Sequence, residues 1–173
     1  MSAERTVQVR HDLPWLPAGS TARLVIADEL PPPELVTAVH LLAFDRDSLL
    51  MVDVRADGRG WNPPGGHREA DESPEKAATR EAQEEACAIV GDLRPFGFQH
   101  VRRSKPAVDC PYPHPDSYQV FLLGRVLRLD PFTETAEVSA RALLEPSEAR
   151  QVRWVREHLP FYEEGLARTR RRS

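Results

Sequence analysis

Apolar residues in this chain gather into short runs separated by proline-rich or polar segments. Runs rich in β-branched and other apolar residues, bounded by turn formers, are typical of β-strands. The pattern predicts strands at residues 21–27, 35–44, 49–54, 96–103, 118–129 and 137–144. The segment WNPPGG, at residues 61–66, is not expected to be regular throughout.

A helix is predicted after this segment. Ser73 suits the N-cap and Pro74 the first helical position. The run PEKAATREAQEEACA, residues 74–88, has no glycine and no further proline and is rich in helix formers. A second helical stretch is predicted at 147–166, interrupted near Pro160. Strands before and after a central helix indicate an α/β layered fold with a mixed sheet.

Three consecutive prolines, residues 31–33, divide the chain, because successive prolines can join neither a helix nor a central strand. They separate an N-terminal extension, residues 1–33, from a main domain, residues 34–166. The remaining residues, 167–173, form a basic tail. Its arginines are interpreted as a solvated chain end, since no groove-reading motif accompanies them.

The overall composition is that of a soluble globular protein, with 40% hydrophobic and 29% charged residues. The net charge of −4 argues against a dedicated nucleic-acid binder. Cys87 and Cys110 lie far apart without metal-ligand spacing, which favours a reduced protein. No secretory signal or membrane-length apolar stretch is found, so we expect a cytoplasmic protein with no membrane partner.

Three glutamates on the predicted helix carry the strongest chemical signal. Glu81, Glu84 and Glu85 are spaced i, i+3 and i+4, so they project from one face, late in the helix. Like charges repel there, and the negative end of the helix dipole disfavours them. A bound divalent cation would remove both penalties. The alternative is a solvated acidic face in which Arg80 pairs with Glu84.

The surrounding residues favour the cation. The chain resembles the Nudix hydrolases, whose box has the pattern G-x5-E-x7-R-E-U-x-E-E-x-G-U with U a bulky aliphatic residue. The charged skeleton and first glycine match at Gly66, Glu72, Arg80, Glu81, Glu84 and Glu85. The departures are uncharged: Ala82 and Ala88 at aliphatic positions, and Cys87 in place of the second glycine.

Cys87 leaves two conformations open. Cysteine takes a left-handed backbone only at a cost of roughly 1 kcal/mol or more. The alternative is that the helix runs on toward Gly91. The small Ala82 and Ala88 are expected to bring the helix closer to the sheet than larger residues would.

The resemblance implies an α/β/α sandwich in which the box forms a loop, a helix and a second loop. It assigns Mg²⁺ or Mn²⁺ binding to Glu81, Glu84, Glu85 and the carbonyl of Gly65. It further implies that Arg80 orients the glutamates, that Glu72 holds the loop, and that Gly66 permits close approach to the helix. The catalytic base would be Glu84, with Glu134 and Glu137 as alternatives from a later loop.

The implied activity is hydrolysis of the diphosphate linkage of a nucleoside diphosphate derivative or a nucleoside triphosphate. The alternative is a Nudix-fold protein that senses a nucleotide without cleaving it, which an intact set of glutamates disfavours. By the same analogy, the segment before Pro31 could pair with a partner's sheet in a homodimer.

Substrate contacts must come from outside the box. Candidates for stacking on a base are Trp61, Phe98, Tyr112 and Tyr118, and candidates for a phosphate contact are Arg102, Arg103 and Lys105. Each also has a structural interpretation, as packing or as an exposed cation. His100, His114 and Cys110 lack partners at metal-ligand spacing. Arg103 stands where ADP-ribose hydrolases have a proline, so the substrate prediction stops at a nucleotide-like diphosphate.

Overall fold

The computed structural model describes residues 4–106 and 112–171 of the chain. Nine strands of this part form one sheet. They are β1 (Arg5–His11), β2 (Thr21–Ile26), β3 (Val36–Asp45), β4 (Ser48–Val54), β5 (Gly60–Asn62), β6 (Gly65–His67), β7 (Ala88–Arg102), β8 (Asp116–Leu129) and β9 (Val138–Leu144). The helices are α1 (Pro74–Ala86), α2 (Pro146–Ala149), α3 (Arg153–Glu157) and α4 (Leu159–Arg170), with short 3₁₀ turns at Pro33–Leu35 and Ala56–Gly58.

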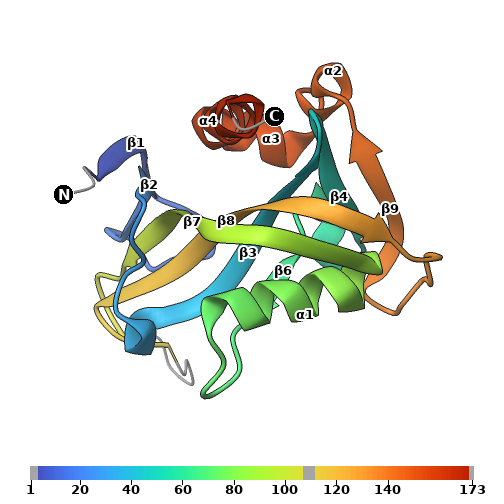
Figure 1. The fold of residues 1–173 in the computed structure, drawn as a ribbon. Coiled ribbons are helices and arrows are strands. Elements are labelled where there is room, and N and C mark those ends of the chain that lie inside the picture. Colours follow the sequence, from blue (N-terminus) through green and yellow to red (C-terminus); the bar gives the residue numbers. More distant parts are fainter. Residues whose placement is uncertain (1–3, 107–111, 172–173) are drawn as a thin grey trace.

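The sheet is mixed, as the sequence predicts. Its main order is β1-β2-β7-β8-β3-β4-β5, with β6 paired to β3 and β9 to β4. The β3–β8 pair is parallel and the other pairs are antiparallel. Helix α1 covers one face of the sheet, and α3 and α4 lie across the other (Figure 1). The predicted α/β/α sandwich is therefore confirmed.

Two apolar layers hold the sandwich together, one on each face of the sheet. On the α1 side, the helix contributes only alanines: Ala77, Ala78, Ala82 and Ala86. On the other side, Phe161, Tyr162 and Leu166 of α4 pack on β-strand side chains. Ala82 and Ala88 are 0% and 1% exposed, which agrees with the expected close approach of α1 to the sheet.

The structure corrects several predicted boundaries. Strand β7 begins at Ala88 rather than near residue 96, because pairing with β8 extends it. Strand β1 was not predicted, because its residues are all exposed or half-buried and only two of them, Val7 and Val9, are apolar. The last helical stretch breaks at His158, and Pro160 lies in the first turn of α4. None of the described helices is long and apolar enough to cross a membrane.

Both terminal segments join the fold. Strand β2 pairs with β1 and with β7 of the same chain, so the segment before Pro31 extends this chain's own sheet, with β1 at the edge; the homodimer stays a prediction. Helix α4 continues to Arg170, which places residues 167–170 in a helix rather than in a solvated tail. Arg168 and Arg170 are tied down by ion pairs with Asp28 and Asp47 from distant segments. Such partners cannot be recognised from the local sequence.

Candidate active site

Helix α1 places the glutamates at the edge of the sheet. The Ser73 side chain accepts a hydrogen bond from the Lys76 amide at 3.2 Å, and Pro74 opens the helix, as predicted. The helix ends at Cys87, whose φ of 45° and ψ of 42° are left-handed. Of the two conformations open to Cys87, the chain therefore takes the strained one, and β7 begins directly after it.

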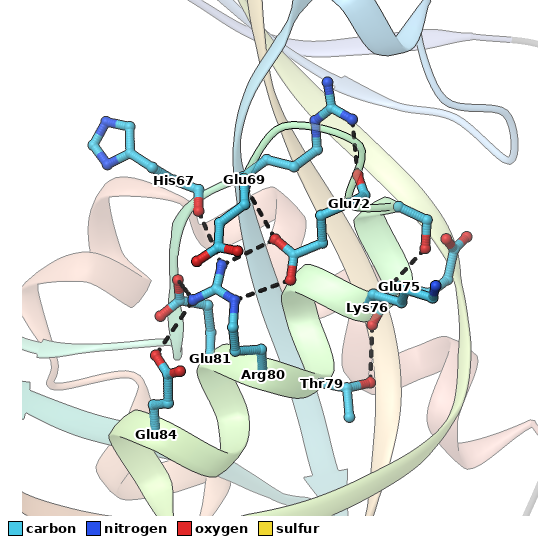
Figure 2. A network of polar contacts seen from close by, with 11 residues as sticks. His67, Glu69, Glu72, Glu75, Lys76, Thr79, Arg80, Glu81 and Glu84 are labelled. Carbon is cyan, nitrogen blue, oxygen red and sulfur yellow. Dashed lines mark hydrogen bonds and ion pairs between the residues drawn. The ribbon is translucent and has the colours of Figure 1, made fainter.

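Arg80 lies at the centre of a polar network around the helix (Figure 2). Its guanidinium donates to both carboxylate oxygens of Glu72, at 2.9 and 3.1 Å. It also donates to Glu81 at 2.9 Å and to Glu84 at 3.3 Å. A further bond reaches the His67 carbonyl at 3.1 Å. One arginine thus fixes the loop before the helix and orients two glutamates, which is the arrangement that the resemblance implies for Arg80 and Glu72.

Two glycines allow strand β6 to approach its neighbours closely. A Cβ atom on Gly66 would lie 2.5 Å from a carboxylate oxygen of Glu81. A Cβ atom on Gly65 would lie 2.4 Å from the carbonyl oxygen of Val39. The amide of Gly65 donates to Glu85 at 2.9 Å. Any larger residue at either position would displace the strand or the glutamates.

The acidic cluster is electrostatically unfavourable in the absence of a cation. Burial raises the pKa of Glu85 to about 7; the Gly65 amide opposes this rise, and repulsion from Glu81 and Glu137 adds to it. Burial also raises the pKa of Glu81, against the effect of Arg80. Glu72 differs, because the hydrogen bonds from Arg80 lower its pKa. The carboxylates closest to the sheet are those that most need a compensating positive charge.

These groups open into a cavity of about 810 Å³. Glu81, Glu84 and Glu85 line it, together with Gly65 and Gly66. Its other walls come from β3, β7, β8, the loop between β1 and β2, and the segments around residues 56–59 and 137. A volume of this size accommodates a nucleotide-sized ligand.

The NUDIX domain family model matches residues 34–165, most of the chain. The chain belongs to the Nudix hydrolase family. A mutant of the Bacillus subtilis pyrophosphohydrolase BsRppH has the same fold, with a TM-score of 0.65 and 21% identity over 87% of this chain and 92% of that one. A NUDIX hydrolase from Nitrosomonas europaea gives a TM-score of 0.57 with 22% identity, covering 75% of this chain and 88% of its own.

An Ap4A hydrolase from C. elegans is a third structure with this fold. It gives a TM-score of 0.55 and 18% identity, covering 75% of this chain and 96% of its own. A comparison with curated protein sequences found no match. The N-terminal extension lies outside the family match, so its part in the site is a property of this Nudix hydrolase that the family model does not describe.

The Nudix glutamates have the donor chemistry of a magnesium site, but their side chains face protein partners. In the described part of the chain, no three His, Cys, Asp or Glu side chains converge closely enough to hold a metal ion. Arg80 binds Glu81 and Glu84, and Gly65 binds Glu85. The Glu84 side chain is 61% exposed. The shared helix face, the common cavity and the raised pKa values of Glu81 and Glu85 fit a divalent cation.

The candidate bases occupy different places. Glu84 and Glu137 both line the cavity of the Nudix hydrolase. Glu134 lies outside the described lining, 60% exposed and in an ion pair with Arg55. Of the three candidate bases, Glu84 and Glu137 therefore lie on the cavity wall and Glu134 does not.

Among the predicted substrate contacts Trp61, Arg102, Arg103 and Tyr118, only Arg103 lies on the described cavity wall. Trp61 instead packs against the apolar layer beneath α4. Arg102 is exposed and pairs with Asp116 at 2.8 Å. Tyr118 stacks on His100, with ring centroids 4.8 Å apart, on the α1 side of the sheet. Alternation along β7 and β8 explains the difference, since neighbouring residues point to opposite faces.

The other residues considered from the sequence also differ in whether they line the cavity. Tyr112 lines the cavity, where it stacks on His67 and lies beneath the Arg103 guanidinium. Phe98 belongs to the buried layer on the α1 side. Cys110 lies outside the described residues. His100 is 7% exposed and is bonded to Arg23 and Asp116, a structural role rather than a metal site.

Several cavity residues were missed by sequence reasoning. They are Trp15, Arg59, His40 and Gln119. His40 and Gln119 lie inside apolar strands, where a polar residue is itself a signal of a site. Burial lowers the pKa of His40 to about 4, so it lines the cavity as a neutral side chain. Trp15 and Arg59 carry no local signal, because only the fold brings their loops to the glutamates.

Proposed function

We propose that this Nudix hydrolase is a divalent-metal-dependent enzyme that cleaves the diphosphate linkage of a nucleoside diphosphate derivative or a nucleoside triphosphate. The observation that carries the proposal is that Glu81, Glu84 and Glu85 all line one nucleotide-sized cavity. Two of these carboxylates have pKa values raised by burial and mutual repulsion, which a cation and its anionic substrate would relieve.

Each residue of the site has a separate proposed role. Glu81, Glu84, Glu85 and the Gly65 carbonyl would hold Mg²⁺ or Mn²⁺, which when bound neutralises diphosphate oxygens and polarises water. Arg80 is held by Glu72 of the loop, and it positions Glu81 and Glu84 by direct hydrogen bonds. Arg103 presents a cation on the same cavity wall and pairs with no carboxylate among the described residues, so it is available to an anionic or acceptor group of the substrate.

Glu84 is the proposed general base. It lines the cavity, its side chain is 61% exposed, and Arg80 holds it near the other glutamates. It would accept the proton of the water that attacks phosphorus, while the nucleotide or phosphate leaves. Glu137 is the competing base, because it lines the same cavity and lies close enough to Glu85 to raise the pKa of that carboxyl.

The test is a product assay with Mg²⁺ or Mn²⁺ on nucleoside triphosphates, oxidised nucleotides, ADP-ribose, nucleotide sugars and dinucleoside polyphosphates. Removing a general base costs about 10²- to 10⁴-fold in rate. We therefore expect Glu84→Gln to lose at least about 100-fold in kcat on the preferred substrate. Glu85→Gln should lose activity that higher metal concentrations partly restore.

Glu75→Gln is the matched control, since Glu75 is an exposed carboxylate at the other end of α1. It should retain wild-type activity. A full loss in Glu137→Gln with an active Glu84→Gln would transfer the base to Glu137. Absence of metal-dependent cleavage across the panel, with nucleotide binding intact, would favour the sensing function instead.

A further inference from the structure

The loop between β1 and β2, residues 12–20, forms part of the cavity wall. Trp15, Leu16 and Pro17 line the same cavity as the three glutamates. This loop belongs to the N-terminal extension and lies outside the residues that match the Nudix family. The extension therefore adds a wall to the site that the family domain alone does not supply.

Hydrogen bonds fix this loop in place. The Ser20 hydroxyl accepts from the Ser104 amide at 3.1 Å, and the Ser104 hydroxyl donates to the Ala18 carbonyl at 2.7 Å. Within the loop, the Ser20 amide donates to the Pro17 carbonyl at 3.1 Å. Ser20 is 2% exposed. The loop is thus tied to the residue that directly follows Arg103, and its position beside the cavity is set by the fold.

Trp15 is left uncovered by these contacts. Its side chain is 55% exposed, the highest value among the large apolar side chains exposed in the described structure. Exposing a tryptophan is unfavourable, because its ring carries the largest apolar area of any side chain. Here the exposed ring stands at a cavity whose other end is acidic, rather than at a flat surface.

The two ends of the cavity are separated across the sheet. Glu81, Glu84 and Glu85 stand beside β6, which pairs with β3. Trp15 stands beyond β7, where its loop meets Ser104. Since β6, β3, β8 and β7 are successive neighbours in the sheet, the ends lie at least three strand spacings apart, roughly 14 Å. This separation is on the scale of a nucleotide rather than of a base alone.

We infer that Trp15 is a substrate-binding residue that stacks on the nucleobase while the diphosphate lies at the glutamates. The inference rests on the proposed function, because it places the diphosphate at the acidic end of the cavity. An indole stacks on any base, since every base has a π-face. Trp15 therefore contributes affinity for nucleotides over base-free phosphates, with little discrimination between bases.

The experiment compares binding of nucleoside monophosphates with binding of ribose 5-phosphate, which lacks a base. Calorimetry in Mg²⁺ would use AMP, GMP, CMP and UMP, the wild type, Trp15→Ala and Trp15→Phe. Base–aromatic stacking lost on alanine substitution corresponds to about 5- to 150-fold in affinity. Trp15→Ala should lower the affinity for the nucleotides by that factor and leave the affinity for ribose 5-phosphate unchanged. Trp15→Phe should retain most of the affinity for the nucleotides.

Leu127→Ala is the matched control, because Leu127 is 53% exposed and does not line this cavity. It should bind all ligands as the wild type does, and thermal unfolding should show each variant folded. Unchanged nucleotide affinity in Trp15→Ala would overturn the inference. So would an equal loss for ribose 5-phosphate, or a wild type that binds nucleotides no better than that sugar phosphate.

The two proposals fail in different ways. If the wild type cleaves a nucleotide but Trp15→Ala leaves its KM unchanged, the hydrolase function stands and base stacking is rejected. If the wild type cleaves nothing but Trp15→Ala loses nucleotide affinity, the cleavage is rejected and base stacking stands. The monophosphates are not cleaved at a diphosphate, so their binding is measured independently of catalysis.

Discussion

Cys87 is the residue at which the chain departs most from its family pattern. It ends α1 with a φ of 45°, a conformation in which a Cβ atom is unfavourable. Its amide bonds the carbonyls of Ala82 and Gln83, and its carbonyl accepts from the Asp130 amide at 2.9 Å. These contacts hold the left-handed turn, so the cysteine is strained and the glutamates one turn earlier keep their place.

Replacing this residue should release the strain. Cys87→Gly is expected to stabilise the protein by about 1 kcal/mol or less, because relief of the left-handed strain exceeds the added flexibility of the unfolded chain. That corresponds to a rise in Tm of about 2–4 °C. Cys87→Ala keeps the Cβ atom and should show no such gain. A Tm for Cys87→Gly at or below that of Cys87→Ala would contradict the interpretation.

At the scale of elements, α1 is held against the sheet by its alanines. Ala77, Ala78, Ala82 and Ala86 are all at most 1% exposed, and they pack on β-strand side chains. Small side chains bring the helix close, and this depth sets how far the glutamates reach into the cavity. The Nudix pattern has a bulky aliphatic residue where Ala82 stands, so the small side chain at this interface is a departure of this chain.

A larger side chain between helix and sheet should therefore destabilise the protein, even where that residue is typical of the family. We expect Ala82→Leu to destabilise the protein by about 1–3 kcal/mol, because no space is left between helix and sheet. Denaturant unfolding would measure this as a lower midpoint. Gln83→Leu, at the exposed neighbouring position, should change the midpoint little. Equal effects of the two substitutions would show that helix–sheet packing is not the cause.

At the scale of the whole molecule, the acidic cavity links stability to pH and metal. Glu85 has a pKa of about 7 when folded and an ordinary value of 4.5 when unfolded. Between these values the folded state holds the extra proton, so this group makes stability fall as pH rises through the window. His40 acts in the opposite direction, because its pKa falls from 6.5 to about 4 on folding.

A comparison of the wild type with Glu85→Gln separates the contribution of Glu85 to the pH dependence of stability from that of His40. Without metal, the variant should gain stability relative to wild type as pH rises from 4.5 to 7, up to on the order of 3 kcal/mol. Added Mg²⁺ should shrink or reverse that gain above pH 7, because the cation stabilises only the ionised glutamate. Thermal unfolding at several pH values, with Mg²⁺ or a chelator, measures both. A difference independent of pH would contradict the shifted pKa.

Local spacing in the sequence determined much of this protein. Apolar runs placed six strands, the Ser73–Pro74 pair placed the start of α1, and i, i+3, i+4 spacing put three glutamates on one helix face. These predictions held because a helix or strand fixes the direction of its side chains through its own geometry. The roles of Arg80 and Glu72 came from the family resemblance, and the structure adds the bonds between these two residues.

Only the tertiary structure decided what faces the glutamates. Trp15, His40, Arg103 and Gln119 are far apart in sequence and meet because β2, β7, β8 and β3 are neighbours in the sheet. The same strand order turned Tyr118 and Arg102 away and kept β2 within its own chain. Strand order depends on long-range pairing, which no local pattern encodes, so the acidic face of the helix was predictable and most of the cavity wall opposite it was not.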